Sequence, residues 1–397
     1  MEPAIRNMFP IYFKQRFPAL DGVRALAILM VFVLHYGGGS RGGRWMEALN
    51  TVRLRGWMGV DLFFVLSGFL ITGVLYDTRE DSHFFKRFYA RRALRIFPAF
   101  YLAAAVVLLL TPVFQYQWRL GQLPMLVYLG NIPAAFDDSL YKVVSANHFR
   151  AQLVLTHLWS VCVEEQFYLL WPLVVWLVRD RIRLLWMAGG ISVLSLGLRV
   201  VMLFFSQGPI AVNLISYTLP FRMDALLVGG MLALLLRGES AERWQGACKW
   251  LLLVTGSLVG GIFVLSPAAN SPWLLSIGLT LIALAGAGLI GWALKRGTLA
   301  ERLLRLRPLR VLGRYSYGFY IYHLIWSKAW VYVGERLAEV MHSGAMARIL
   351  TTLLNFGVTF LVAKLSYDWF EVHWLRQKVH FAYDAETSAQ RDSLAAN

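Results

Sequence analysis

The chain has 397 residues, of which 58% are hydrophobic and only 16% are charged. Its mean hydropathy of +0.54 is typical of a polytopic membrane protein and excludes an ordinary soluble enzyme. The formal net charge of +16 would suggest nucleic-acid binding in a soluble domain, but here Lys and Arg cluster between apolar runs. In those places they set topology and meet anionic membrane lipids, so we expect no nucleic-acid partner.

Ten apolar segments follow one another along the chain, each long enough, at about 17 to 25 residues, to cross a hydrocarbon core of about 30 Å. They cover residues 20–38, 57–76, 97–114, 158–178, 184–205, 214–236, 249–266, 273–294, 313–333 and 346–370. A shorter apolar piece, 123–136, is interrupted by Gly130, Asn131 and Pro133, which favours a re-entrant or interfacial segment. The sequence therefore predicts an all-α transmembrane bundle of about ten spans with one such segment.

Basic residues between these segments indicate the topology. With both termini in the cytoplasm, the strongly basic loops fall inside, as the positive-inside rule requires. The exception is the first external loop, whose arginines are Arg41, Arg44, Arg53 and Arg55. We expect one membrane-embedded domain over residues 1–380 and a disordered cytoplasmic tail over 381–397.

The first span contains two ionisable residues, Arg24 and His35. At about 1.5 Å and 100° per residue, their spacing brings the imidazole back almost over the guanidinium, roughly 16 Å further along one helix face. Ionisable residues within a span normally face an interior cavity, so the pair favours a polar shaft through a bundle. The alternative is that Arg24 snorkels to the headgroups and His35 caps the far end of the helix.

The most basic stretch carries five cations: Lys86, Arg87, Arg91, Arg92 and Arg95. Positive-inside bias alone explains such an accumulation. However, Arg92 and Arg95 are three positions apart, so on a helix they project together and can bind one phosphate group. A nucleotide with several phosphates would suit this site.

The second and fourth spans add buried polar groups. Asp61 can be a helix N-terminal carboxylate, and Ser67-Gly68 is a small-residue patch that admits another helix or a slender ligand. Glu164 and Glu165 lie inside the fourth span with no cation in that segment. One of the two must face the bundle interior, where it meets a cation from another span or stays protonated.

The sixth and ninth spans contain Arg222 and Asp224, and His323, respectively. Arg222 is a candidate partner for Glu164 or Glu165, whereas a lone His323 is more often a hydrogen-bonded core residue. Seven such groups together predict a polar chamber, namely His35, Asp61, Glu164, Glu165, Arg222, Asp224 and His323. No metal-ligand spacing is evident, so we expect no metal.

Seven pieces of the chain form a recognisable pattern. They read LDGVRALAILMVFVLHY, VDLFFVLSGFLI, FYARRALRIFP, HLWSVCVEEQFYLLWP, FRMDALLVGG, LGRYSYGFYIYHL and YDWFEVHWL. With these motifs the sequence resembles the acyltransferase-3 family of integral-membrane acyltransferases over about residues 19–376. The pattern departs at Cys162 and at Val372-His373, where relatives often have another small or apolar residue and a proline.

The resemblance implies a ten-span bundle in a bacterial inner membrane. Such a protein takes an acyl group, usually acetyl, from cytoplasmic acyl-CoA and gives it to a hydroxyl of an envelope polysaccharide, a lipid-linked glycan or another acceptor. By the same resemblance Arg24, His35, Arg92 and Arg95 match functional positions of the family. We expect Arg24, Ser67, Arg92 and Arg95 to bind acyl-CoA, with its thioester arriving near His35.

For the reaction, we expect neutral His35 to act as general base on the acceptor hydroxyl. Glu164, or with less support Asp61, would orient the imidazole, and Arg222 would stabilise the oxyanion. An acyl group carried on His35 is the rival route. The residues expected to bind the acceptor are Arg222, Asp224 and His323.

Two alternatives compete with this hypothesis. A proton-coupled transporter would also use intramembrane charges, but no inverted repeat is visible. An acyltransferase for a small acceptor, such as a macrolide-type product, is the second. No soluble hydrolase-like domain follows Arg376, so we expect the chain to complete the transfer itself or to hand the acyl group to a separate protein. Homo-oligomerisation is compatible with the sequence.

Overall fold

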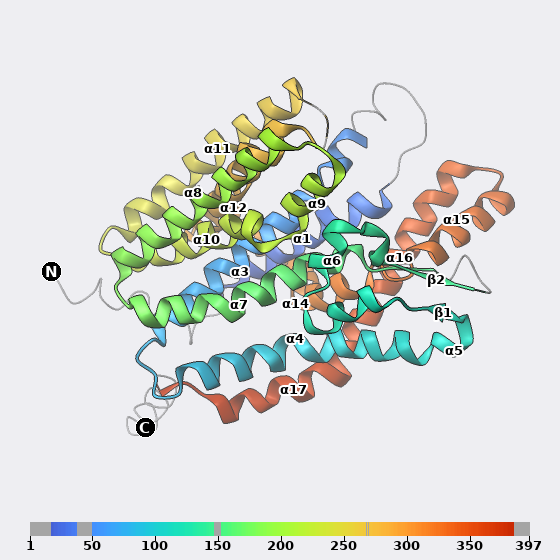
Figure 1. The fold of residues 1–397 in the computed structure, drawn as a ribbon, viewed down its shortest axis with the longest axis horizontal. Helices are drawn as coiled ribbons and strands as arrows, with labels where there is room; N and C mark the ends of the chain where they lie inside the picture. Colours follow the sequence, from blue (N-terminus) through green and yellow to red (C-terminus); the bar gives the residue numbers. More distant parts are fainter. Residues whose placement is uncertain (1–16, 38–49, 147–151, 267, 269, 385–397) are drawn as a thin grey trace.

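The computed structural model describes residues 17–37, 50–146, 152–266, 268 and 270–384. Within these ranges nine helices are long and apolar enough to cross a membrane, which confirms the predicted all-α transmembrane bundle (Figure 1). In chain order they are α1 (Pro18–Tyr36), α3 (Met58–Asp77), α4 (Phe84–Leu109), η5 with α7 (Thr156–Leu158 and Trp159–Val178), α8 (Arg181–Phe205), α9 with α10 (Pro209–Tyr217 and Leu219–Leu235), α11 (Ala241–Leu265), η6 with α12 (Leu274–Gly278 and Leu279–Leu294), and α16 (Gly344–Leu365) continued by η7 (Ser366–Glu371), α17 (Val372–Arg376) and η8 (Gln377–Phe381).

The apolar stretch 313–333 is the one predicted span that is not among these nine helices. Its residues belong to α14 (Arg307–Tyr322) and α15 (Ser327–Met341), which are separated by a turn. Neither proline nor glycine occurs between residues 319 and 330, so a helix-breaking residue does not cause the turn.

Side chains bind the last carbonyls of α14 in place of a further helical turn. His323 Nδ1 lies 2.7 Å from the Tyr320 carbonyl oxygen, and His157 Nε2 lies 3.0 Å from that of Ile321. The Tyr36 hydroxyl donates to the His323 carbonyl over 2.5 Å. Because the end of a helix leaves its carbonyls without intrahelical donors, these contacts allow α14 to stop here. They also bring α1, η5 and α14 to one point.

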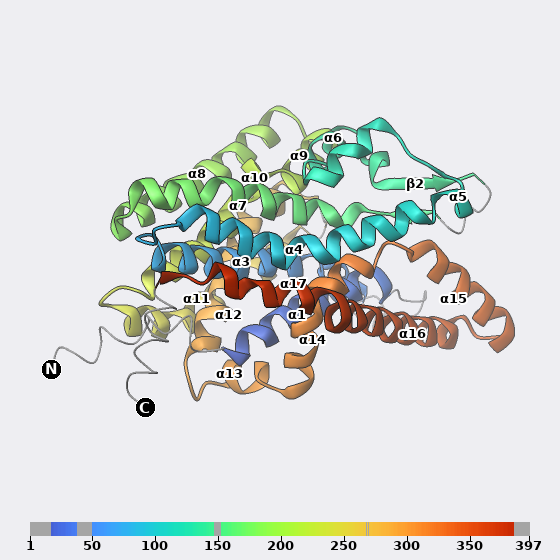
Figure 2. The same cartoon turned by 90° about the horizontal axis from the view of Figure 1, so that it is seen from below.

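Helix α3 lies at the centre of the bundle and packs against α1, α7, α10 and α12 (Figures 1 and 2). Its crossing with α10 is very close, because a Cβ atom on Gly68 would lie 1.7 Å from the Leu226 carbonyl oxygen and one on Gly229 would lie 1.9 Å from that of Val65. The small-residue patch at Ser67-Gly68 is therefore a helix-packing site.

A small irregular unit joins α4 to α7. It contains the antiparallel strands β1 (Tyr116–Gln117), β2 (Lys142–Ser145) and β3 (Leu153–Val154) together with α5 (Thr111–Phe114), η2 (Leu120–Val127), α6 (Asn131–Phe136) and η3 (Asp138–Tyr141). The piece 123–136 thus forms short helices that cannot cross a membrane. Gln166 of α7 donates to Asn131 over 2.8 Å, and Asn131 donates to the Tyr217 carbonyl over 2.8 Å, which holds the unit against the bundle.

Two arginines of the loop between α1 and α3, which the sequence predicts to be external, make specific contacts. Arg53 donates to the Leu34 carbonyl at the end of α1 over 2.7 Å, and the Arg55 guanidinium lies 4.2 Å from the centre of the Phe263 ring. These contacts account for two cations that topology alone does not explain. Arg41 and Arg44 lie outside the described residues.

The described part of the predicted tail packs against the start of α4. The Tyr383 side chain is buried, and Arg87 donates to Asp384 over 2.5 Å. The remainder of that prediction, residues 385–397, lies outside the described residues. The short helix α13 (Leu299–Leu304) precedes α14 and contacts both α1 and α12.

Candidate active site

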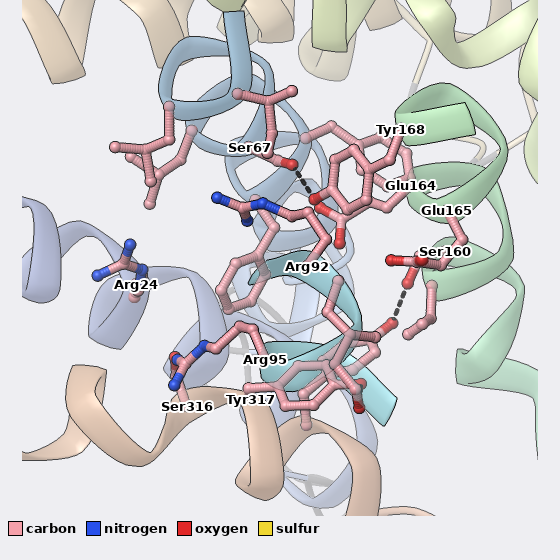
Figure 3. A pocket seen from close by; sticks show the side chains of 18 of the residues that line it. Arg24, Ser67, Arg92, Arg95, Ser160, Glu164, Glu165, Tyr168, Ser316 and Tyr317 are labelled. Atoms are coloured by element: carbon pink, nitrogen blue, oxygen red, sulfur yellow. Dashed lines mark hydrogen bonds between the residues drawn. The ribbon is translucent and has the colours of Figure 1, made fainter. Parts of the chain in front are cut away.

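Three arginines and two glutamates line a cavity of about 150 Å³ between α1, α3, α4, α7 and α14. We name it the arginine cavity. Figure 3 shows Arg92 and Arg95 extending from α4 toward the side from which Arg24 of α1 approaches, with Glu164 and Glu165 on α7 opposite. The helical spacing of Arg92 and Arg95 thus brings both to one cavity, as predicted.

Charge is unevenly balanced in the arginine cavity. Arg24 is paired with Asp21 one turn earlier at 2.5 Å. Arg92 lies about 6 Å from the ring centres of Phe88 and Tyr168, a cation–π range. Among the described residues, no carboxylate oxygen lies within the 4.0 Å of an ion pair with Arg92 or with Arg95.

Both glutamates of α7 line this cavity. Glu164 shares the lining of the cavity with Ser67, Tyr168 and Arg92, and Ser67 and Tyr168 are hydrogen-bonded to each other. One carboxylate oxygen of Glu165 is buried without a partner among the described residues. The predicted interior position is therefore found for both carboxyl groups.

A second cavity, of about 240 Å³, lies further along the same helices. Its wall includes His35, His157 and Arg222 together with the aromatic rings of Trp57, Trp159, Tyr217 and Tyr320. We name it the histidine cavity. Val60 and Tyr320 line both cavities, so the two cavities adjoin at these side chains, which separate them.

Hydrogen bonds indicate which nitrogen of His35 is basic. Its Nδ1 lies 2.8 Å from the Val31 carbonyl oxygen, and His323 Nδ1 lies 2.7 Å from that of Tyr320. Because a carbonyl only accepts, both Nδ1 atoms carry hydrogen when the rings are neutral. His323 Nε2, 3.3 Å from His35 Nδ1, then faces that hydrogen as an acceptor, and the lone pair of His35 is on Nε2.

The predicted partners of His35 lie elsewhere. Asp61 is buried against Arg222 at 2.6 Å, and Glu164 lines the arginine cavity. The His35 ring instead lies within hydrogen-bond distance of the Val31 carbonyl and the His323 ring. The prediction that Arg222 pairs with Glu164 or Glu165 was wrong, because the close crossing of α3 and α10 places Asp61 next to it.

Asp224 is held in a buried ion pair that the sequence did not indicate. Arg199 of α8 is fully buried and donates to both carboxylate oxygens of Asp224, over 2.9 and 2.7 Å. Thr280 of α12 also donates to Asp224 over 2.7 Å. Asp224 lines neither cavity. A lone arginine inside an apolar segment was the available signal for this pair.

Two further site residues were missed from the sequence. His157 lies in the histidine cavity, and its motif HLWSV was noted without assigning this residue a role. Tyr320 donates to the His157 carbonyl over 2.7 Å and is hydrogen-bonded to Ser160 at 2.6 Å. In the described ranges, no group of three or more His, Cys, Asp or Glu side chains is arranged to hold a metal ion.

Comparison with known proteins agrees with this geometry. The sequence model of an acyltransferase domain, that of the acyltransferase-3 family, matches residues 17–367. This chain belongs to the acyltransferase-3 family. The match covers both cavities and supports an acyltransferase over a proton-coupled transporter.

Curated relatives of this family member are described as O-acetyltransferases. The chain is 30% identical to the putative peptidoglycan O-acetyltransferase YrhL of Bacillus subtilis over 89% of its length and 54% of that protein. It is 28% identical to the peptidoglycan O-acetyltransferase OatA of Listeria monocytogenes, over 91% and 56% of the two chains. For the O-acetyltransferase OatA of Staphylococcus aureus the identity is 26%, over 92% and 58%. The chain thus spans little more than half the length of these relatives, and no solved structure matches it.

Proposed function

We propose that this protein transfers an acyl group, usually acetyl, from cytoplasmic acyl-CoA to a hydroxyl of an envelope polysaccharide or lipid-linked glycan in a bacterial inner membrane. One observation carries the proposal: a cavity in which Arg92 and Arg95 form no ion pair among the described residues adjoins a cavity that contains a histidine whose Nε2 carries the lone pair. The O-acetyltransferase relatives support the choice of an acetyl group and a glycan.

The arginine cavity fits the phosphate-bearing part of the donor. Two guanidinium groups on one helix face, Arg92 and Arg95, make charge-assisted bonds that suit phosphate oxygens, and Arg24 adds a third cation nearby. The surrounding stretch is the most basic of the chain, which supports a cytoplasmic location for this end of the bundle under the positive-inside rule. We therefore assign the phosphates of acyl-CoA to this cavity, with Ser67 beside the pantetheine arm.

The histidine cavity would then hold the thioester and the acceptor. His35 Nε2 takes the proton of the hydroxyl as its oxygen attacks the thioester carbonyl, and the proton returns to the sulfur of CoA as the C–S bond breaks. His323 accepts from Nδ1 and stabilises the positive ring in place of the expected Glu164. Arg222 remains the candidate for the oxyanion, since it lines this cavity.

The rival route through an acyl group on His35 uses the same Nε2 atom. In either route the acceptor is a hydroxyl that reaches the histidine cavity from the side opposite the arginines. The hydroxyl that accepts the acyl group can belong to the glycan itself, or to a separate protein or a further domain that receives the acyl group from this one.

The test compares acetyl-CoA binding and turnover by purified protein in detergent. Arg92→Ala/Arg95→Ala removes two charge-assisted contacts, each worth about 1.5–3 kcal/mol, so we expect at least about 100-fold weaker binding. His35→Ala should bind acetyl-CoA as the wild type does but show no turnover above the protein-free rate. Arg305→Ala/Arg336→Ala is the matched control, because both of these side chains are largely exposed.

Two results would contradict the proposal. Normal turnover by His35→Ala would exclude both chemical routes. No interaction of the wild type with any acyl-CoA would exclude the donor assignment.

A further inference from the structure

His157 has a buried nitrogen that the fold does not use. The side chain is 4% exposed, and its Nε2 lies 3.0 Å from the Ile321 carbonyl oxygen. Because that carbonyl accepts, Nε2 carries the hydrogen and Nδ1 carries the lone pair of the neutral ring. Nδ1 is buried and has no partner among the described residues. An unsatisfied buried acceptor costs about 1–3 kcal/mol, so its persistence calls for an explanation.

The position of His157 relates it to the reacting centre. Its ring centre lies 5.0 Å from that of His323, and the His323 ring centre lies 5.2 Å from that of His35. His35 and His157 both line the histidine cavity, and the buried His323 ring behind them packs against both. The hydrogen bond from His157 Nε2 to the Ile321 carbonyl caps α14, so it explains why that nitrogen lies there. It gives Nδ1 no role.

Other atoms in the same wall indicate the kind of ligand. Trp57 Nε1 and Arg222 Nε are buried donors without partners in the described part of the chain, and four aromatic rings line the cavity. Unused donors, an unused acceptor and aromatic surface suit a molecule with apolar faces and several hydroxyls. At about 240 Å³ the cavity is smaller than the roughly 300–1,000 Å³ of sites for drug-sized ligands. One sugar unit of a longer glycan meets these conditions.

We propose that the histidine cavity binds a single sugar unit of the acceptor and that His157 Nδ1 accepts a hydrogen bond from one of its hydroxyls. This inference rests on the proposed function and adds the place and the recognition of the acceptor. His157 holds the sugar while His35 Nε2 takes the proton of the reacting hydroxyl. Small side-chain adjustments, which are common on binding, bring the buried Nδ1 to the ligand. An internal water would satisfy Nδ1 too, and the test separates the two.

Two substitutions separate the contribution of His157 Nδ1 from that of Nε2. His157→Gln keeps an N–H group near the position of Nε2, so it retains the bond to Ile321 but lacks an acceptor at Nδ1. His157→Asn places a carbonyl oxygen near Nδ1 and loses the bond to Ile321. His380→Gln is the control, because that histidine is exposed on η8.

Each variant is given acetyl-CoA with one of three nucleophiles. Two are sugars, methyl N-acetyl-β-glucosaminide and the peptidoglycan disaccharide, and the third is hydroxylamine, which is too small to need a sugar site. We expect His157→Gln to acylate hydroxylamine at the wild-type rate above the His35→Ala background, with a KM for the sugar about tenfold higher. His157→Asn should recover a KM within about threefold of the wild type.

Each other outcome has a definite meaning. A wild-type KM for the sugar in His157→Gln would overturn the inference and assign Nδ1 to water. Loss of sugar and hydroxylamine transfer together in both variants would overturn it in favour of a purely structural role at the end of α14. A wild type that acylates hydroxylamine but neither sugar would overturn the acceptor assignment alone, whereas one that acylates nothing would overturn the proposed function.

Discussion

Buried arginines in the part of the bundle formed by α3, α8 and α10 form ion pairs with carboxylates, whereas the half-buried Arg92 and Arg95 of the arginine cavity form none among the described residues. Arg199 with Asp224 and Arg222 with Asp61 form close pairs between neighbouring helices. On α4, Arg92 and Arg95 have no such partner among the described residues. A charge in a low-dielectric region needs compensation. The paired set therefore supports the fold, and under the proposed function the phosphates of the donor supply the counter-charge for Arg92 and Arg95.

The largest effect is expected when one of the buried ion pairs is broken. Asp224→Asn leaves the Arg199 guanidinium uncompensated in the interior, so we expect a loss of about 3–5 kcal/mol in the free energy of unfolding. Thermal or denaturant unfolding in detergent measures it. The control is Arg199→Met/Asp224→Leu, which removes the pair together and should be near neutral. An equal loss in the double variant would show that packing, and not charge, dominates.

The second prediction has an intermediate effect and concerns the histidine cavity. There the neutral ring of His323, and not a carboxylate, is the partner of His35. His323→Leu removes the acceptor for His35 Nδ1–H. A hydrogen bond to a charged group contributes about 1.5–3 kcal/mol, so kcat should fall roughly 10- to 100-fold while KM for acetyl-CoA stays unchanged. His323→Gln, which keeps an acceptor oxygen near the position of Nε2, should recover part of the rate. A rise in KM with constant kcat would instead assign His323 to binding.

The smallest effect on stability is expected for Arg92 and Arg95, which form no ion pair among the described residues. Arg92→Ala/Arg95→Ala should change the free energy of unfolding without ligand by no more than about 0.5 kcal/mol per site, because no ion pair is broken. Acetyl-CoA should stabilise the wild type against unfolding and fail to stabilise this variant. A large loss of stability in the ligand-free variant would mean that the two arginines belong to the structural set after all.

Helix length and apolarity predicted the membrane bundle, because a hydrocarbon core requires continuous apolar helices whatever their neighbours are. The spacing of Arg92 and Arg95 predicted their common direction for the same local reason. The turn between α14 and α15 was not predictable from the local sequence, since it depends on donors from α1 and η5. The sequence shows how far along a span a residue lies, but it does not show which neighbouring helix that residue faces.

That limit explains the errors at the site. Asp61, Glu164 and Glu165 lie at depths from which each could reach Arg222, and only the crossing at Gly68 and Gly229 selects Asp61. Arg199 was overlooked because a single arginine in an apolar run gives no sign of its partner. A histidine just before a helix, such as His157, is commonly a simple cap, and the sequence does not reveal that its Nδ1 is buried without a partner among the described residues.

The wall between the two cavities has a consequence for the energised membrane itself. A continuous water column from one face to the other would let protons run down the gradient on which the cell depends. Tyr320, anchored by its hydroxyl to His157 and Ser160, and Val60 divide that column into two short ones. Under the proposed function, the slender acyl arm of the donor would pass between these two side chains, so the membrane would stay electrically tight while the acetyl group is transferred.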